Sequence, residues 1–277
     1  ADGVTNFAKN YDIQVTAGNS KVNAKKIYLN NINASTTYGS KEGLRADGNV
    51  SLQDNSIVYG DKVSLKDGAS VSYKADGEYA ANKGDRDTAD AGTYKADVAV
   101  TGAELVGNEL GNYELVNNAT GVITVKKATL NVGLNDVVRT YGNAKITSGS
   151  YSAGNITGLV NGDSYKAGDV KVTVTGDGAI AGVSGSRVTN DAGNYEWTGS
   201  ASTTNAGLDK NYNLVVTANG KSTVEKATLN VGLSDVYRTY GNAAITSGSY
   251  SASKITGLVN GDSYDASAIT VNKTSDG

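Results

Sequence analysis

Tyrosine is the side chain in this sequence best suited to contact a ligand. The chain has 17 Tyr, one Phe and one Trp, and a tyrosine ring can stack on a sugar while its hydroxyl makes a hydrogen bond. Most of the tyrosines recur at matching places along the chain, which favours a structural role; these sets are Tyr38/Tyr141/Tyr240, Tyr11/Tyr113/Tyr212, Tyr151/Tyr250 and Tyr165/Tyr264. The aromatic residues without such a counterpart are the better candidates for ligand binding, and they are Tyr59, Tyr73, Tyr79, Tyr237 and Trp197.

Three carboxylates lie within six residues, at Asp85, Asp87 and Asp90. Clustered carboxylate oxygens on a loop are suitable ligands for Ca²⁺. The stretch lacks the spacing of a calcium-binding EF-hand loop, and Arg86 offsets part of its charge, so we interpret it as a solvated acidic loop. The Asn-Gly-Asp sequences that end at Asp163 and Asp262 are interpreted as turns. The sequence predicts no metal site and no cofactor.

The residue types that are missing exclude most catalytic chemistry. The chain contains no Cys, His, Met or Pro, so it has no disulfide, no thiolate nucleophile and no imidazole base. Paired carboxylates alone can hydrolyse a glycoside, but a near-identical duplication of the chain is unusual for an active site. We therefore expect no enzyme activity and assign no catalytic residue.

Lys127 and Lys226 each open a predicted strand, and an Asn-Tyr-X-Leu strand follows late in the module that Lys127 begins. A buried lysine that reaches an asparagine side chain can form an isopeptide bond, which would take the place of the missing disulfides. This cross-link requires a buried lysine within reach of the asparagine, and intact-mass spectrometry, which detects the loss of one ammonia for each bond, would test the hypothesis.

The elements that position these residues repeat along the chain at a spacing of 99 residues. Residues 126–178 match residues 225–277 at 39 of 53 positions, and weaker matches extend back to Thr37-Tyr-Gly39 and to Asn10-Tyr11. Such repetition is typical of arrays of modules rather than of a single active site. We predict the tail of a preceding repeat at 1–24, a divergent module at 25–125, a second module at 126–224 and the first half of a further module at 225–277.

Apolar and polar residues alternate within a module. Leu130, Val132 and Leu134 are separated by Asn131 and Gly133, and this two-residue period is typical of a strand with one buried face. Asn-Gly and Asp-Gly pairs at short intervals predict tight turns, and no segment shows a helical apolar stripe of ten or more residues. We expect an all-β fold, a tandem array of antiparallel β-sandwich-like modules of about 100 residues each, with a β-solenoid as the alternative.

Charge and hydropathy limit the partners of the chain. The net charge is −3 and no basic stripe is present, so nucleic acid is not an expected partner. No apolar run approaches the roughly 18 residues of a membrane-spanning segment, so membrane insertion is not expected. The sequence that follows Ala1 lacks the basic and apolar regions of a signal peptide, so any export signal is expected to lie outside this chain.

Five short sequences follow one another in the order Lys-Ala-Thr-Leu, Thr-Tyr-Gly, Gly-Leu-Val-Asn-Gly-Asp, Ala-Gly-Asn-Tyr and Asn-Tyr-Asn-Leu. They occupy residues 127–130, 140–142, 158–163, 192–195 and 211–214, and the first three return between residues 226 and 262. This pattern resembles the mostly-β, glycine-rich (MBG-type) repeat domains of large secreted bacterial surface adhesins. The resemblance implies an exported, extracellular array that holds an adhesive tip away from a bacterial surface, and it implies no catalytic residue.

Three functions are open at this level. The leading one is a structural and adhesive repeat region of such an adhesin, which acts as an elongated spacer and multivalent contact surface in cell adhesion or biofilm. The second is a subunit of an extracellular filament, in which incomplete terminal modules complete each other head to tail by strand addition. The third is a carbohydrate-binding module. The expected partners are other modules of the same array or copies of the chain itself, and surface glycans for the third function.

Overall fold

The computed structural model describes residues 11–12, 14–54, 56–74, 77–117 and 119–275. Its elements are mostly β-strands, so the all-β prediction is confirmed. The chain divides into two compact units. The first unit consists of residues 1–35, 44–81 and 93–124, and the second consists of residues 36–43, 82–92 and 125–277. The second unit therefore includes two short segments from the predicted module 25–125.

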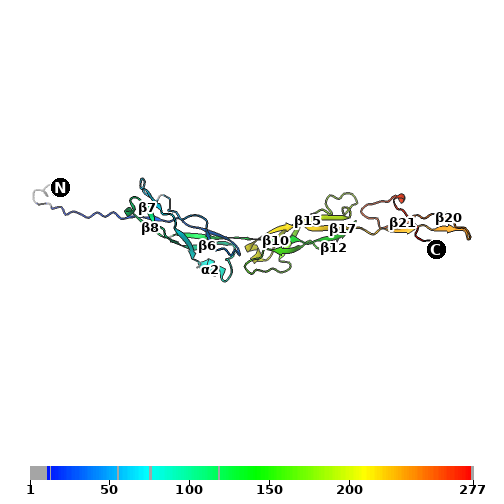
Figure 1. The fold of residues 1–277 in the computed structure, drawn as a ribbon, viewed down its shortest axis with the longest axis horizontal. Coiled ribbons are helices and arrows are strands. Elements are labelled where there is room, and N and C mark those ends of the chain that lie inside the picture. The colour runs from blue at the N-terminus through cyan, green and yellow to red at the C-terminus, as the bar shows by residue number, and fades with distance from the viewer. Residues whose placement is uncertain (1–10, 13, 55, 75–76, 118, 276–277) are drawn as a thin grey trace, which may run out of the picture. The chain divides into compact units, whose positions relative to one another are not determined.

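The elements up to residue 126 form three sheets around a small core (Figure 1). In chain order they are β1 (Lys25–Tyr28), β2 (Ala34–Thr37), β3 (Arg45–Ala46), β4 (Val63–Leu65), β5 (Ser70–Lys74), α2 (Gly77–Lys83), β6 (Gly92–Thr101), β7 (Leu105–Gly107), η1 (Leu110–Asn112), β8 (Tyr113–Val116) and β9 (Thr120–Lys126). A five-stranded sheet has the order β3-β2-β9-β6-β5, while β1 pairs with β8 and β4 pairs with β7. The buried cluster of the first unit is formed by Leu29, Ile32, Val100 and Ala119.

The elements after residue 127 lie in the second unit (Figure 1). They are β10 (Ala128–Leu134), β11 (Val137–Thr140), β12 (Ile146–Gly149), β13 (Ala153–Thr157), β14 (Val170–Asp177), β15 (Gly193–Thr203), α3 (Ala206–Asn211), β16 (Tyr212–Ala218), β17 (Gly220–Glu225), β18 (Asn230–Leu233), β19 (Val236–Arg238), β20 (Ile245–Gly248), β21 (Ala252–Thr256) and η2 (Ala266–Ala268). One sheet has the order β13-β10-β16 and another has the order β12-β11-β17-β15-β14.

Strand β10 shows why the alternating residues form a sheet. Ala128, Leu130, Val132 and Leu134 are buried, while Thr129 between them is exposed. Every second side chain of a strand points to the same face, so this pattern places four apolar side chains on one core. The buried face of β10 is the one predicted from the sequence.

The sheets contain parallel as well as antiparallel pairs, which differs from the purely antiparallel expectation. The strand pairs β1–β8, β10–β16 and β11–β17 are parallel. Leu130 lies opposite Leu214, and Val132 lies opposite Val216. Strands that start a sequence copy thus pair with strands that end it. Parallel strands need a long connection, and the remaining strands of the copy provide that connection.

Trp197 on β15 is fully buried in the core of the second unit, together with Leu134 and Val137. Its indole N–H donates to the carbonyl of Asn135 at 2.8 Å. Gly220 gives the ring its space, because a Cβ at this position would lie 1.9 Å from the indole nitrogen. The packing of this large ring therefore depends on a glycine on the neighbouring strand.

A buried ion pair lies beside Trp197. The Arg139 guanidinium is 2.9 Å from the Asp177 carboxylate, and both side chains are 1% exposed. Arg139 also donates to the hydroxyls of Ser222 at 2.8 Å and Tyr151 at 2.7 Å. Burial alone would raise the pKa of Asp177, but its hydrogen bonds with Tyr151, Ser222 and Arg139 and with the Ala179 N–H outweigh burial and lower this pKa. The carboxylate is thus held in its charged form inside the core.

Two short α-helices were not predicted, because each is shorter than a recognisable apolar stripe. Helix α3 begins after Asn205, whose side chain accepts hydrogen bonds from the N–H groups of Gly207 and Leu208. Such N-terminal capping stabilises a helix locally, and Asn205 is the signal in the sequence. In the part of the chain that the structure describes, no helix has the length and apolar character needed to cross a membrane.

Residues 225–277 repeat part of this arrangement. Strand β18 pairs with β21 as β10 pairs with β13, and the register repeats: Val132 lies opposite Ile156, and Val231 lies opposite Ile255. Strand β19 pairs with β20 as β11 pairs with β12. Among the described residues, β18 and β19 have no parallel partner strand corresponding to β16 and β17. The strand residues of β18 are all exposed.

Candidate functional site, two matching interfaces between sequence copies

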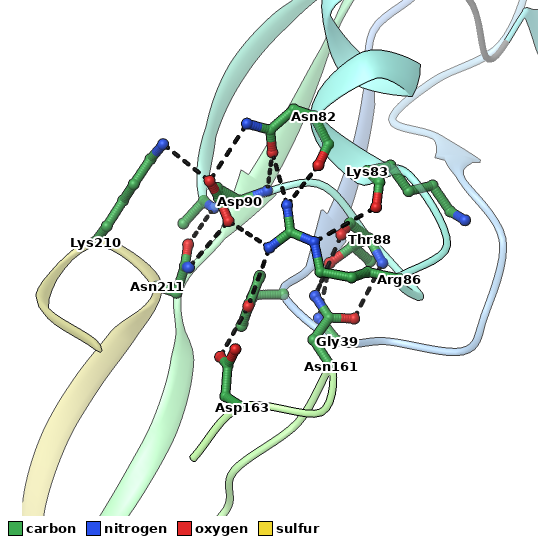
Figure 2. A network of polar contacts seen from close by, with 12 residues as sticks. Gly39, Asn82, Lys83, Arg86, Thr88, Asp90, Asn161, Asp163, Lys210 and Asn211 are labelled. Atoms are coloured by element: carbon green, nitrogen blue, oxygen red, sulfur yellow. Dashed lines mark hydrogen bonds and ion pairs between the residues drawn. The ribbon is translucent and has the colours of Figure 1, made fainter. Parts of the chain in front are cut away.

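Asn161 is the centre of a contact between the first and second sequence copies, which are the predicted modules 25–125 and 126–224. It lies in a turn with φ 57°, the left-handed region that Asn tolerates better than most residues. Its side-chain oxygen accepts from the N–H groups of Asp87 at 2.9 Å and Thr88 at 3.3 Å, and its side-chain nitrogen donates to the Thr88 carbonyl at 3.2 Å (Figure 2). One side chain thereby binds a short stretch of backbone more than 70 residues away. All of these residues belong to the second compact unit.

Tyr38 and Tyr212 meet at the same carboxylate beside Asn161. The Tyr38 hydroxyl donates to Asp163 at 2.8 Å, and the Tyr212 hydroxyl donates to the same oxygen at 2.9 Å. The two rings pack edge to face with centroids 5.5 Å apart, an arrangement favoured between aromatic rings. Burial is the main cause that raises the pKa of both hydroxyls. Both tyrosines therefore remain neutral donors at any physiological pH.

Gly39 completes this contact through its backbone. Its φ is +71°, and its N–H donates to the Thr88 hydroxyl at 2.8 Å. A Cβ at residue 39 would lie 2.1 Å from the Cγ2 atom of Val160. Close approach of the two copies thus requires a glycine here. We call the contacts of Tyr38, Gly39, Thr88, Asn161 and Asp163 the first interface.

The same contacts recur between the second copy and residues 225–277. The Asn260 side-chain oxygen accepts from the N–H groups of Val188 at 2.6 Å and Thr189 at 3.2 Å, and its nitrogen donates to the Thr189 carbonyl at 2.8 Å. The Tyr141 hydroxyl donates to Asp262 at 2.7 Å. We call the contacts of Tyr141, Gly142, Thr189, Asn260 and Asp262 the second interface.

The second interface also matches the first in its backbone. The Gly142 N–H donates to the Thr189 hydroxyl at 3.0 Å, and a Cβ at Gly142 would lie 2.3 Å from Val259. Asn260 has φ 60°, close to the φ of Asn161. Two separate parts of the chain thus use the same residue types, backbone conformation and hydrogen bonds.

Asp90 belongs to a second polar network at the first interface (Figure 2). Its carboxylate is 2.6 Å from Arg86 and 3.1 Å from Lys210. Asn211 donates to Asp90 at 3.1 Å and accepts from the Ala91 N–H at 2.7 Å. Burial alone would raise the pKa of Asp90, but the hydrogen bonds from Arg86, Lys210 and Asn211 outweigh it and lower this pKa well below the usual range.

Acid is expected to weaken this network. A carboxylate whose pKa is lowered by folding stabilises the protein above its unfolded pKa of about 4, and that stabilisation is lost as the pH falls toward the folded value. The free energy of unfolding should fall between pH 5 and pH 2. In the Asp90→Asn variant it should fall by about 1–2 kcal/mol less, as measured by urea unfolding at each pH. Asp191→Asn is the matched control, because the Asp191 side chain is 80% exposed and that of Asp90 is 19% exposed. If the two substitutions changed the pH dependence of stability equally, the conclusion that the interface contacts lower the pKa of Asp90 would be contradicted.

The acidic loop is therefore an interface element. Asp85 and Asp87 are exposed, and Asp90 pairs with the basic groups described above. Among the described residues, no group of three acidic side chains is arranged to hold a metal ion. The interpretation as a plain solvated loop was wrong for Asp90.

Two of the predicted ligand-binding aromatic residues are buried. Trp197 and Tyr79 are 0% and 4% exposed, so neither ring can stack on a sugar. The Tyr73 hydroxyl donates to the Asn33 carbonyl, whereas the rings of Tyr59 and Tyr237 are exposed. The burial of Trp197 depends on Gly220, which lies on another strand.

The isopeptide hypothesis is also wrong for Lys127. This lysine is exposed, and its ammonium group donates to the carbonyl of Asp209 in α3. Lys127 instead connects the start of β10 to the helix that precedes β16.

The sequence contains a signal for the interface residues, which is missed when Asn-Gly-Asp is interpreted only as a turn. Val-Asn-Gly-Asp occurs at 160–163 and 259–262, and the corresponding sequence in the first copy is Val58-Tyr-Gly-Asp61. Asp61 accepts from the Tyr113 hydroxyl, which also accepts from the Val58 N–H at 3.0 Å. Tyr212 makes the same contacts with Asp163 and Val160. The Asp is thus present at this place in all three copies. The Asn is present only in the two copies in which its side chain binds Thr88 or Thr189.

Comparison with known proteins gave no relative. A scan of the chain against protein-family models found no match, and neither a search of curated proteins nor a search of solved structures found one. The two interfaces are therefore the main structural basis for a function.

Proposed function

We propose that this chain is a structural repeat region of a secreted bacterial surface adhesin. In this role the array acts as an extracellular spacer with repeated contact surfaces for cell adhesion or biofilm. The observation that carries the proposal is the duplication of one interface, in which Tyr–Asp and Asn–Thr contacts recur with the same atoms. The resemblance of the sequence to MBG-type adhesin repeats supports the same role.

The energetics of the interfaces suit a spacer. A hydrogen bond between partly buried groups contributes about 0.5–1.5 kcal/mol, and Asn161 alone makes four hydrogen bonds to the segment 87–88, three of which are partly buried. Rotation of residues 125–277 against the segments 36–43 and 82–92 of the same unit would break these bonds together. The interfaces are therefore expected to resist bending, which is the property that a spacer needs.

Small-angle scattering of the whole chain tests the proposal. A compact protein of this length has a radius of gyration of about 19 Å. The proposal predicts a clearly larger value for the monomer, together with a linear Guinier region. A value near 19 Å would contradict a spacer.

Substitution of the two interface asparagines tests the role of the interfaces in the same measurement. The double variant Asn161→Ala/Asn260→Ala should lower the radius of gyration and broaden the distance distribution, because each connection becomes a hinge. Circular dichroism should remain that of a β-protein. Asn155→Ala is the control, since Asn155 is exposed on β13. If the double variant scatters like the control, the interfaces do not set the geometry of the array.

A further inference from the structure

The first copy has a short sheet that the second copy lacks. Among the described strands β4 pairs only with β7, and both lie in the first unit. In the second copy the residues that correspond to β4 are 165–167, which form no strand, and α3 stands at the place of β7. The contacts that recur along the chain form its interfaces, so a feature confined to one copy points to a separate function.

Strand β4 has an outer edge whose backbone groups are open to a further strand. The Lys66 N–H and the Lys62 carbonyl bond to the residues that flank β7, at 2.8 Å and 3.0 Å. Backbone groups of alternate residues in a strand point to opposite edges, so the N–H and C=O groups of Val63 and Leu65 point away from β7. No other described strand pairs with this edge.

Residues 50–53 have an outer edge of the same kind. Leu52 forms an isolated antiparallel bridge with Leu29. On either side of Leu52, the Ser51 carbonyl and the Gln53 N–H bond to the chain beside Leu29, at 2.8 Å and 3.0 Å. The N–H and C=O groups of Leu52 therefore point to the opposite, outer edge.

Two adjoining cavities lie between these edges. The larger is about 590 Å³ and is lined by residues of both segments, 50–54 and 63–65. The smaller is about 450 Å³, and Val50 and Leu65 line both cavities. Val50, Leu52 and Leu65 also pack against the core cluster of the first unit. The cavities thus form one groove with an apolar floor and a backbone edge along each wall.

The groove is suited to an extended peptide rather than to a sugar. Among the described residues no aromatic side chain lines either cavity, so a sugar ring has no ring to stack on. An extended peptide can pair with open backbone edges and place alternate side chains on an apolar floor. Residues 58–61, which correspond to residues 160–163 of the first interface, line neither cavity. The groove is therefore a different surface from the interfaces.

The charges of the groove favour a peptide with basic residues. Asp54 lines the larger cavity and Asp67 lines the smaller one. Both residues are exposed, and neither forms an ion pair with another described residue. Lys66, which also lines the smaller cavity, is paired with Glu104 at 2.7 Å. A lysine or arginine near each end of a bound peptide would complement the two unpaired carboxylates.

We propose that the groove between residues 50–53 and β4 binds an extended peptide of a partner protein as one additional strand. The peptide backbone pairs with Leu52 on one wall and with Val63 and Leu65 on the other. Alternate apolar side chains of the peptide cover the floor, and basic residues near its ends face Asp54 and Asp67. The site is independent of the spacer function, because it lies within the first unit and uses no interface residue.

Selection from a library of random heptapeptides on the immobilised full chain tests the proposal. Sequences that alternate apolar and polar residues between lysines or arginines should be enriched. Synthetic peptides of these sequences should slow amide hydrogen exchange at Leu52, Val63 and Leu65. Methylation of the peptide nitrogens that face the walls should weaken binding about tenfold or more, because at least two hydrogen bonds are lost. A selection without enrichment, or peptides that leave exchange at these three amides unchanged, would overturn the proposal.

Variants of the full chain locate the site. Val63→Pro removes an N–H that points away from β7, the position at which an edge strand tolerates proline, and should weaken binding about fivefold or more. Val63→Thr, which keeps this N–H, is the matched control and should retain binding. Asp54→Asn/Asp67→Asn should weaken binding about threefold at low salt, whereas Asp85→Asn, an exposed residue of the second unit, should not.

Two results from these variants would contradict the proposal. Equal binding by Val63→Pro and Val63→Thr would show that the open backbone edge does not hold the peptide. Self-association of the natural chain that Val63→Pro abolishes would assign the groove to a strand of a second copy instead of a partner protein. The spacer function is tested separately, by scattering from the monomer without peptide, so either conclusion can fail alone.

Discussion

Replacing Arg139→Ala is expected to lower the free energy of unfolding of the second unit by about 3–5 kcal/mol, the range for removal of one partner of a buried ion pair. The substitution leaves the Asp177 carboxylate in the core without its cation, while both side chains of the pair are 1% exposed. It also leaves the hydroxyls of Ser222 and Tyr151 without the donor that now reaches them. Urea unfolding followed by the fluorescence of Trp197, which lies beside this network, measures the loss directly.

The chain supplies its own control for this prediction. Arg238 occupies the corresponding place in residues 225–277 and donates to Tyr250 at 2.6 Å, but it is exposed. Arg238→Ala should cost less than about 1 kcal/mol, as is usual for exposed charged groups. If Arg139→Ala and Arg238→Ala proved equally mild, the buried pair would not stabilise the second unit.

Replacing Gly39→Ala is expected to open the first interface at a cost of about 2–5 kcal/mol. About 1–2 kcal/mol comes from placing a Cβ at a φ of +71°. A further 1–3 kcal/mol is the usual cost of overpacking, because the new Cβ would lie 2.1 Å from Val160. The Thr88 N–H, which donates to Asn161, should exchange with solvent roughly 30-fold faster or more, as measured by amide hydrogen exchange.

Gly241→Ala separates backbone strain from the contact. Gly241 has φ +80°, and a Cβ there would meet no atom within 4 Å. This variant should therefore lose only the stability that corresponds to the unfavourable φ, and amide exchange at Thr88 should stay unchanged. Faster exchange at Thr88 in Gly241→Ala, or unchanged exchange in Gly39→Ala, would contradict the close approach of the two copies as the reason for the glycine.

The buried face of a strand could be predicted from the sequence, but the partner of the strand could not. The alternation over residues 128–134 gives the exposed and buried faces of β10 directly. Its parallel pairing with β16 joins Leu130 to Leu214, and neither local sequence nor turn chemistry specifies such a distant pair. The direction of pairing depends on the complete core, which includes the burial of Trp197 against β17.

The interface residues show the same limit. The sequence around Asn161 correctly predicts a turn, and the residue has the left-handed φ that the turn requires. The same side chain also binds Thr88 in another copy, and a single turn cannot reveal a contact made over this distance. The available signal was residue 59, where Tyr stands in place of the Asn of an otherwise constant Val-Asn-Gly-Asp sequence.

Each interface joins two different surfaces, a Thr-Tyr-Gly turn on one copy and a Val-Asn-Gly-Asp turn on the next. Every copy that carries both turns has one surface of each kind, so a copy can be inserted or deleted by recombination of the gene without leaving a mismatched neighbour. In the proposed spacer, the length of the array is then free to vary by whole copies. Under the proposed function, selection on the reach of the spacer can act on copy number alone, with every contact residue unchanged.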